Sequence, residues 1–289
     1  MSLTRSMFRW LPDDIYLRIQ FRKMMKRPLD LRHPKTLNEK LQWLKIHDRK
    51  PEYTKMVDKI SAKEYAASII GEEHIVPTLG IWNSFDEIDF STLPDKFVLK
   101  ASNGSGNRSV VVCRDKASLN LRKARRRINH GMRRNAYTEY REWPYKDIKS
   151  RIIAETLLED NDKGAAITDY KFLCFDGKPH DVMICKNRGS NLRFHYFDRE
   201  WNYLRYDKRS YEDPEGFTID KPEGMDEAFT LAEKLSKGFK CIRVDLYIVG
   251  GKCYFSELTF YPGSGYDKVI LESTDRMYGD LLRLPTDEG

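Results

Sequence analysis

The segment Cys241–Gly265, CIRVDLYIVGGKCYFSELTFYPGSG, constrains the fold more strongly than any other part of the chain. Apolar and polar residues alternate on both sides of a Gly-Gly pair, and this pattern predicts two antiparallel β-strands joined by a tight turn. One face of the hairpin is apolar and belongs to a core. The other face carries Arg243, Asp245, Glu257 and Thr259.

The register of this hairpin decides whether its two carboxylates meet. Directly opposed residues of an antiparallel pair lie on the same side of the sheet, and the loop length sets which residues are opposed. A two-residue loop at Gly250 pairs Asp245 with Ser256 and turns Glu257 away. A three-residue loop or a bulge brings Asp245 opposite Glu257. A metal site on this face therefore requires the odd loop or the bulge, and the alternative is a solvated face with an incidental cluster of charges.

Length and composition exclude several classes of protein. The 289 residues suffice for one large domain or two closely packed ones. No run of about 18 apolar residues occurs, so we expect no membrane span. The first residues lack the apolar stretch of a secretory signal, and we expect a cytoplasmic protein. The five cysteines are dispersed without a CxxC pair, which indicates reduced core thiols rather than disulfides or a zinc site.

The formal net charge of +7 favours acidic partners, such as nucleotides, uronic acids, phospholipid head groups or nucleic acid. Much of this charge lies between Arg122 and Arg134, on a helix predicted to begin after Ser118-Leu119-Asn120. Such a helix presents either a solvated basic face or a binding patch. No RNP, zinc-finger or basic-zipper pattern accompanies it, so we expect no sequence-specific recognition of nucleic acid.

The first half of the chain offers two candidate phosphate-binding features. Asp58 is expected to cap a helix that Gly71 ends, and this places Lys59 in the first turn, where a lysine is unusual on dipole grounds. Further on, the strand-like run FVLK ends at Lys100 and leads into a Gly104-Ser105-Gly106 loop and a second strand. Such a loop is either an ordinary hairpin turn or a cover for phosphates, with Lys100 supplying a charge.

Charged side chains also interrupt the later apolar strands. Glu155 lies within RIIAETLL, and a carboxylate in such a run needs a specific partner. In the next strand Asp169 and Lys171 share one face, which fits the wall of a polar cleft. His195, on a later strand, is expected to have a structural role.

Taken in order, these features resemble the ATP-grasp superfamily, and more narrowly its TupA-like branch of teichuronopeptide biosynthesis. The resemblance runs from about Pro34 to Gly265 and lies in order and spacing rather than in any single motif. The phrases that suggest the narrower match are PKTLNEKLQWLK, FDEIDF, LPDKFVLK, REWPY, LSKGF, RVDLY and ELTFYPGSG.

The resemblance implies an α+β fold of the ATP-grasp type, in which two α+β subdomains clasp a nucleotide. We expect an N-terminal helical segment over residues 1–57, a small subdomain with a phosphate-covering loop over residues 58–155, and a large subdomain with a metal-binding hairpin over residues 156–289.

The resemblance also implies a set of site residues, carried over position by position. The nucleotide phosphates would be bound by Lys59 and Lys100 and covered by Gly104, Ser105 and Gly106. Glu155 would begin the interdomain hinge, adenine would be recognised by backbone groups of Thr156, Leu157 and Leu158, and the ribose by Asp169, with Lys171 beside it. Magnesium would be bound by Asp245, Glu257 and Thr259. Arg243 would steady an acyl-phosphate, with Lys100 as the second catalytic residue. Thr259 stands where most of the superfamily has asparagine, and a hydroxyl is a poorer magnesium ligand than an amide carbonyl.

The implied chemistry uses ATP and Mg²⁺. A substrate carboxylate attacks the γ-phosphate, and an amine then displaces phosphate from the acyl-phosphate. The expected partners are a small-molecule amine and a carboxylate-bearing substrate, for example a uronic acid of a cell-surface polysaccharide precursor. Peripheral contact with a membrane is compatible with the charge. Two alternatives stay open: an ATP-grasp kinase acting on a sugar, and a noncatalytic nucleotide- or polysaccharide-binding partner of glycosyltransferases.

Overall fold

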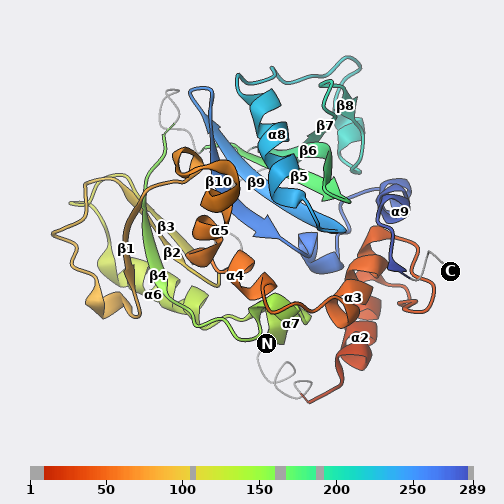
Figure 1. The fold of residues 1–289 in the computed structure, drawn as a ribbon, viewed down its shortest axis with the longest axis horizontal. Helices are drawn as coiled ribbons and strands as arrows, with labels where there is room; N and C mark the ends of the chain where they lie inside the picture. Colours follow the sequence, from red (N-terminus) through yellow and green to blue (C-terminus); the bar gives the residue numbers. More distant parts are fainter. Residues whose placement is uncertain (1–9, 105–108, 160–166, 187–191, 286–289) are drawn as a thin grey trace. The chain divides into compact units, whose positions relative to one another are not determined.

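The computed structural model describes residues 10–104, 109–159, 167–186 and 192–285. The chain divides into two compact units (Figure 1). The small unit is Lys50–Ala166, and the large unit combines Met1–Arg49 with Ile167–Gly289. Each unit holds one antiparallel sheet and several helices, so the fold is α+β, as the sequence predicts.

The sheet of the small unit has the strand order β1-β4-β2-β3, and all of its pairings are antiparallel. Its strands are β1 (Thr78–Trp82), β2 (Phe97–Ala101), β3 (Val110–Cys113) and β4 (Ile152–Thr156). Its helices are α4 (Tyr53–Val57), α5 (Ser61–Ile70), α6 (Leu121–Met132) and α7 (Ala136–Tyr140), with 3-10 turns η1 (Glu72–His74), η2 (Phe85–Glu87) and η4 (Trp143–Tyr145).

Helix α6 covers one face of this sheet and contacts β2 and β3 (Figure 1). Its Ala124 and Ile128 belong to the same buried cluster as Phe97 and Leu99 of β2. The side chain of Asn120 accepts a hydrogen bond from the backbone N–H of Lys123 at 2.9 Å, which confirms the predicted start of the helix. The exposed side of α6 carries Arg122, Lys123, Arg125, Arg126 and Arg127.

The sheet of the large unit has the strand order β10-β9-β5-β6-β7-β8 and is also antiparallel. Its strands are β5 (Asp169–Phe175), β6 (Lys178–Lys186), β7 (Arg193–Phe197), β8 (Tyr203–Leu204), β9 (Cys241–Val249) and β10 (Lys252–Thr259). Its helices are α2 (Asp13–Met25), α3 (Leu37–His47), α8 (Met225–Ser236) and α9 (Glu272–Leu281), with 3-10 turns η5 (Ser210–Glu212) and η6 (Pro262–Gly265).

Helix α8 lies across β9, β5 and β6 and covers the apolar face of this sheet (Figure 1). The fully buried ring of Phe229 meets Phe172 of β5 edge to face, with 4.9 Å between ring centroids. Because side chains alternate across a strand, this packing leaves the opposite face of β5 and β9 to their charged residues.

The N-terminal helix α3 packs on α9 and η6 of the large unit. Thr36 and Glu39 form a complete capping box at its start. The buried Nζ of Lys45 donates to the backbone oxygen of Ser264 at 2.8 Å. These long-range contacts join the first 49 residues to the large unit, whereas the sequence suggested a separate segment over residues 1–57.

The five cysteines are all buried and free, which confirms the expectation of reduced core thiols. Within the described ranges, no helix combines the length and the apolar character needed to cross a bilayer.

Candidate functional site

The hairpin β9–β10 adopts the register that brings its carboxylates together. Its loop has two residues, Gly250-Gly251, both at positive φ (55° and 78°), which suits a type I′ turn. The register then shifts by one residue at Ser256, so Asp245 is opposite Glu257. This β-bulge confirms the bulge alternative, and the three-residue loop is not used.

Asp245 is the centre of a charge cluster on the polar face of the large sheet, and its side chain is fully buried. Its Oδ1 accepts a hydrogen bond from Nε of Arg243 at 2.6 Å, and its Oδ2 accepts one from Nη2 of the same guanidinium at 2.8 Å. Nζ of Lys171, directly opposite on β5, also donates to Asp245 Oδ2. Lys171 in turn forms an ion pair with Asp169 at 3.3 Å.

Arg243 extends this cluster to β10. Its Nη2 lies 3.3 Å from Oε1 of Glu257 and 3.1 Å from Oγ1 of Thr259. Burial disfavours the charge on Arg243, but Asp245 and Glu257 outweigh burial and hold its pKa above the usual value. The cluster therefore keeps a permanent positive charge beside two carboxylates.

The donor set of this cluster fits a magnesium ion. Carboxylate oxygens are ligands that Mg²⁺ prefers, and Asp245 and Glu257 are directly opposed across two strands. The cluster contains three carboxylates and two cations, namely Asp169, Asp245 and Glu257 with Lys171 and Arg243. Its formal charge is therefore −1, and a bound divalent ion would change this charge to +1. Among the described residues, no group of three or more His, Cys, Asp and Glu is arranged to hold a metal. Any protein-held Mg²⁺ would thus have few carboxylate ligands, as at nucleotide sites, where phosphate oxygens complete the shell.

In the small unit, Glu155 is buried and joined to two lysines. Its Oε2 lies 2.5 Å from Nζ of Lys100, which is a diagonal neighbour on β2, and its Oε1 accepts a hydrogen bond from Nζ of Lys63 at 2.8 Å. Burial raises the pKa of Glu155, but the two lysines outweigh burial and lower that pKa from 4.5 to about 2. Glu155 thus has the specific partner that the sequence predicts, in the form of two ammonium groups. One of these belongs to Lys63, which the sequence analysis did not identify.

Lys59 lies at the base of the Gly-Ser-Gly loop. Helix α4 ends at Val57 and α5 begins at Ser61, so Lys59 lies between the two helices, and the prediction that it occupies a first helical turn was wrong. Its backbone N–H donates to Ser102 O at 3.1 Å, and its Nζ donates to Gly104 O. Lys59 and Lys100 are thus both placed in the small unit, at or near the start of this loop.

Gly104 is required by close packing. A Cβ at Gly104 would lie 2.1 Å from Oγ of Ser109, and Gly104 does not have a positive φ. A Cβ added at Gly131 of α6 would lie 2.5 Å from the Cβ of Ser109. Gly104 and Gly131 thus both pack tightly against Ser109. The other two predicted loop residues, Ser105 and Gly106, lie outside the described residues.

The predicted adenine-binding segment continues β4 in the small unit. The backbone N–H of Thr156 donates to Pro77 O at 3.0 Å, so this donor is already used within the small unit. Both of these side chains are partly exposed.

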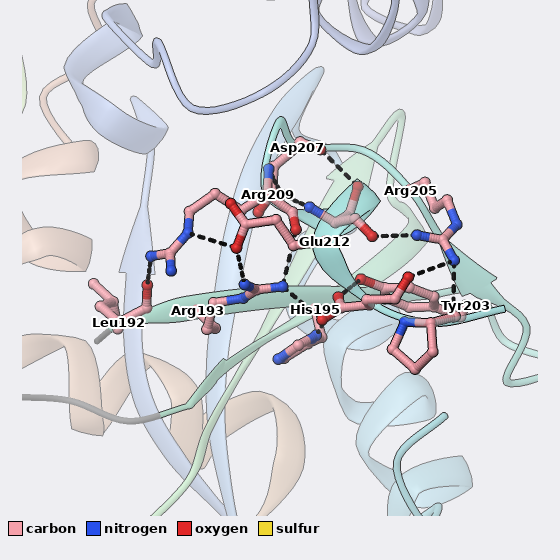
Figure 2. Close-up of polar contacts among 11 residues, drawn as sticks. Leu192, Arg193, His195, Tyr203, Arg205, Asp207, Arg209 and Glu212 are labelled. Carbon is pink, nitrogen blue, oxygen red and sulfur yellow. Dashed lines mark hydrogen bonds and ion pairs between the residues drawn. The ribbon is translucent and has the colours of Figure 1, made fainter. Parts of the chain in front are cut away.

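A second charged network, around β7 and β8, has a structural character (Figure 2). Arg193 lies 2.6 Å from Glu212 and 2.5 Å from Asp213. The ring of His195 stacks on Phe217, with 4.9 Å between centroids, and its Nδ1 lies 3.5 Å from the Asp213 carboxylate. These contacts hold the segment after β8 against the sheet and support the structural role predicted for His195.

The profile of the family described as TupA-like ATPgrasp matches residues 39–283. This chain therefore belongs to the TupA-like ATP-grasp family, as the resemblance predicted. No curated protein matches the chain.

Solved structures similar to this chain include the following three proteins. D-alanine–D-alanine ligase from Bacillus anthracis, complexed with ATP, is 16% identical, over 78% of this chain and 60% of that one, with a TM-score of 0.44. The ADP complex of purK, N5-carboxyaminoimidazole ribonucleotide synthetase, is 14% identical over 77% and 50%, with a TM-score of 0.47. The ATP-grasp ligase PsnB, complexed with minimal precursor, Mg and ADP, is 12% identical over 80% and 59%, with a TM-score of 0.40. The chain thus spans between half and three fifths of the length of these proteins.

Proposed function

We propose that this protein is an ATP- and Mg²⁺-dependent carboxylate-amine ligase that forms an amide through an acyl-phosphate. The observation that carries the proposal is the bulged register of β9–β10, which sets Asp245 against Glu257 beside Arg243. A solvated face does not need a bulge to align two carboxylates, whereas a metal-bound phosphate does need two aligned oxygen ligands. Membership of the TupA-like ATP-grasp family also supports an ATP-dependent ligase.

Each member of the charge cluster has a proposed role. Asp245 and Glu257 bind the magnesium ion, which, when bound, neutralises the triphosphate. Thr259 is a third, weaker ligand, since its hydroxyl already accepts a hydrogen bond from Arg243. Arg243 steadies the transferring phosphoryl group with its planar fork of donors. Lys171 holds Asp245 in place until the metal competes for the same oxygen.

The remaining site residues are proposed to bind the nucleotide. Lys59 and Lys100 supply positive charge to its phosphates from the base of the loop that contains Gly104. Glu155 holds Lys100 in a fixed position. We propose that backbone groups of Leu157 and Leu158 recognise adenine and that the carboxylate of Asp169 accepts hydrogen bonds from the ribose, and that Ser105 and Gly106 belong to the phosphate cover.

The proposed reaction balances without a protein nucleophile. A substrate carboxylate oxygen attacks the γ-phosphorus and ADP leaves, after which the amine nitrogen attacks the acyl carbon, phosphate leaves and the nitrogen loses a proton. The basic face of α6 is compatible with an acidic acceptor, so we propose a uronic acid or a similar carboxylate of a cell-surface polysaccharide precursor. Because the donor is ATP, we place the reaction in the cytoplasm.

A panel of uronic acids and amino acids tests this function. The protein is incubated with ATP and Mg²⁺, released ADP and phosphate are measured, and products are weighed by mass spectrometry. An amide product with one phosphate per ADP is expected. When the carboxylate is labelled with ¹⁸O, one labelled oxygen must appear in the phosphate, since the acyl-phosphate passes it on. A stable phosphorylated sugar without amide contradicts the ligase and identifies a kinase.

One observation favours a second candidate, a noncatalytic nucleotide-binding protein. Thr259 replaces the amide of most ATP-grasp sites, and its hydroxyl contacts Arg243 at 3.1 Å. Under this alternative the protein binds ATP but consumes none with any pair of substrates. Glu257→Gln then leaves polymer assembly in cells intact, whereas the ligase predicts its loss.

A further inference from the structure

A small cavity of about 70 Å³ lies in the large unit beside the charge cluster. Its floor is the polar face of the sheet, where Lys171, Arg243 and Asp181 contribute to the lining. Its other walls come from the start of α3, from η6 and from Tyr278 of α9. The cavity thus adjoins the residues proposed to hold the reacting phosphate.

Asp181 and Arg243 are aligned on this face by strand pairing. Leu173 of β5 is opposite Arg243 on one side and opposite Asp181 on the other. Neighbouring strands are about 4.8 Å apart, so the backbones of Asp181 and Arg243 are separated by roughly 10 Å. Side chains and a small bound molecule span such a distance.

Asp181 has an unused hydrogen-bond acceptor. Its side chain is 1% exposed, and its Oδ2 accepts a hydrogen bond from the Tyr278 hydroxyl at 2.7 Å and lies 3.0 Å from Nδ1 of His180. Its Oδ1 is buried and has no hydrogen-bond partner within the described part of the chain. Burial raises the pKa of Asp181, although His180 and Tyr278 oppose the shift. Most buried polar atoms have a hydrogen-bond partner, and this oxygen has the capacity to accept one.

The wall opposite the sheet is fixed by its own hydrogen bonds. Oδ1 of Asn38 accepts from the backbone N–H of Asp267 at 2.7 Å, and its Nδ2 donates to Asp267 O at 3.1 Å. The backbone N–H of Asn38 donates to Asp275 at 2.9 Å. A wall held in this way keeps its shape, so the size of the cavity limits what enters it.

The size and charge of the cavity define a class of ligand. One water needs about 10–15 Å³ of such space, so the cavity has room for roughly five atoms of that size. Two carboxylates, Asp181 and Asp267, contribute to the lining, together with the cations Lys171 and Arg243. These features suit a small molecule that carries an ammonium group.

We propose that this cavity binds the amine substrate, an amino acid or a similarly small primary amine, and that Asp181 recognises its ammonium group through Oδ1. The place of this step in the reaction rests on the proposed ligase function, but the binding of the amine does not.

Binding is tested on the full-length protein without nucleotide, using glycinamide as the probe. Met183 contributes to the cavity lining, so protein labelled with ¹³C at the methionine methyl groups reports occupancy by NMR. Glycinamide should shift the Met183 signal in a saturable manner. Propionamide, which replaces the ammonium by a methyl group, and glucuronate should not shift it.

Two matched substitutions test the role of Asp181. Asp181→Asn keeps the size of the side chain and removes its charge, and we expect glycinamide to bind at least about tenfold more weakly. Asp176→Asn makes the same change at an exposed turn and should leave binding unaltered. Equal binding of glycinamide by Asp181→Asn and the wild type, or equal binding of propionamide and glycinamide, overturns the proposal. If Asp181→Asn fails to fold, the wild-type probes decide alone.

A parallel titration with a fluorescent ATP analogue and Mg²⁺ separates this proposal from the ligase function. The wild type and Asp181→Asn should bind the nucleotide equally. If neither protein binds nucleotide while glycinamide still shifts Met183, the ligase function fails and the amine site stands. If both bind nucleotide and glycinamide has no effect on the wild type, the amine site fails and the ligase function stands.

Discussion

Replacing Glu155 by glutamine should strongly destabilise the small unit. The change keeps the shape of the side chain but leaves Lys63 and Lys100 facing a neutral amide in a buried site. Removal of one partner from a buried ion pair typically costs about 3–5 kcal/mol. The lowering of the Glu155 pKa from 4.5 to about 2 corresponds to roughly 3 kcal/mol at neutral pH. Burial also lowers the pKa of Lys63, and this offsets part of the gain, so we expect a loss near 3 kcal/mol.

The pH dependence of the same variant gives an independent check. A carboxyl group with a lowered pKa in the folded state stabilises the protein above pH 4.5, and this contribution disappears as the pH falls to about 2. The difference in unfolding free energy between wild type and Glu155→Gln should therefore shrink over that window.

Urea unfolding at several pH values, with hydrogen exchange of β2 and β4 to identify the unit that unfolds, provides the measurement. Glu64→Gln is the matched control, because Glu64 is exposed on the same helix as Lys63. A loss below about 1 kcal/mol, or one that does not change between pH 5 and pH 2, refutes the reasoning.

Three further predictions concern the large unit. Deleting Ser256 should keep Asp245 opposite Glu257, because only the bulged residue is removed. Mg²⁺-dependent ATP binding, measured by calorimetry, should therefore persist. Loss of this binding would show that the bulge itself is needed. Gly250→Ala should cost about 1–2 kcal/mol in urea unfolding, since φ is +55° and no atom lies within 4 Å of the added methyl group, and Gly250→Asn should cost less. The imidazole of His195 should titrate below pH 6.5 by NMR, because burial lowers its pKa more than Asp213 raises it. The contribution of the neutral imidazole to stability is therefore lost as the pH falls below 6.5. Titration above pH 6.5 would contradict this prediction.

The sequence was informative where the structure is local. The hairpin, the capping box at Thr36 and the cap at Asn120 all follow from short patterns of residue types. The bulge is also visible in the residue pattern of β10. The buried positions are odd-numbered at Cys253 and Phe255 and even-numbered at Leu258. This change of parity places the extra residue between Phe255 and Leu258.

Contacts between distant segments were not predictable from these patterns. Lys63 reaches Glu155 only because α5 packs beside the sheet, and a lysine on an amphipathic helix ordinarily points to solvent. The cavity beside Asp181 combines residues from α3, β6 and α9, which no spacing rule connects. The prediction that Lys59 lies in the first turn of a helix was wrong, because a short helix, α4, ends before Lys59 and α5 begins after it.

We propose above that Asp245 and Glu257 bind the magnesium ion of a bound nucleotide. Isothermal titration of ATP into the wild type, Glu257→Gln and the exposed-site control Glu200→Gln, each with Mg²⁺ and with EDTA, tests it most directly. We expect Mg²⁺ to strengthen ATP binding by at least about tenfold in the wild type and the control and to have little effect in Glu257→Gln. The same magnesium dependence in all three proteins, or no binding of ATP by the wild type, would contradict it.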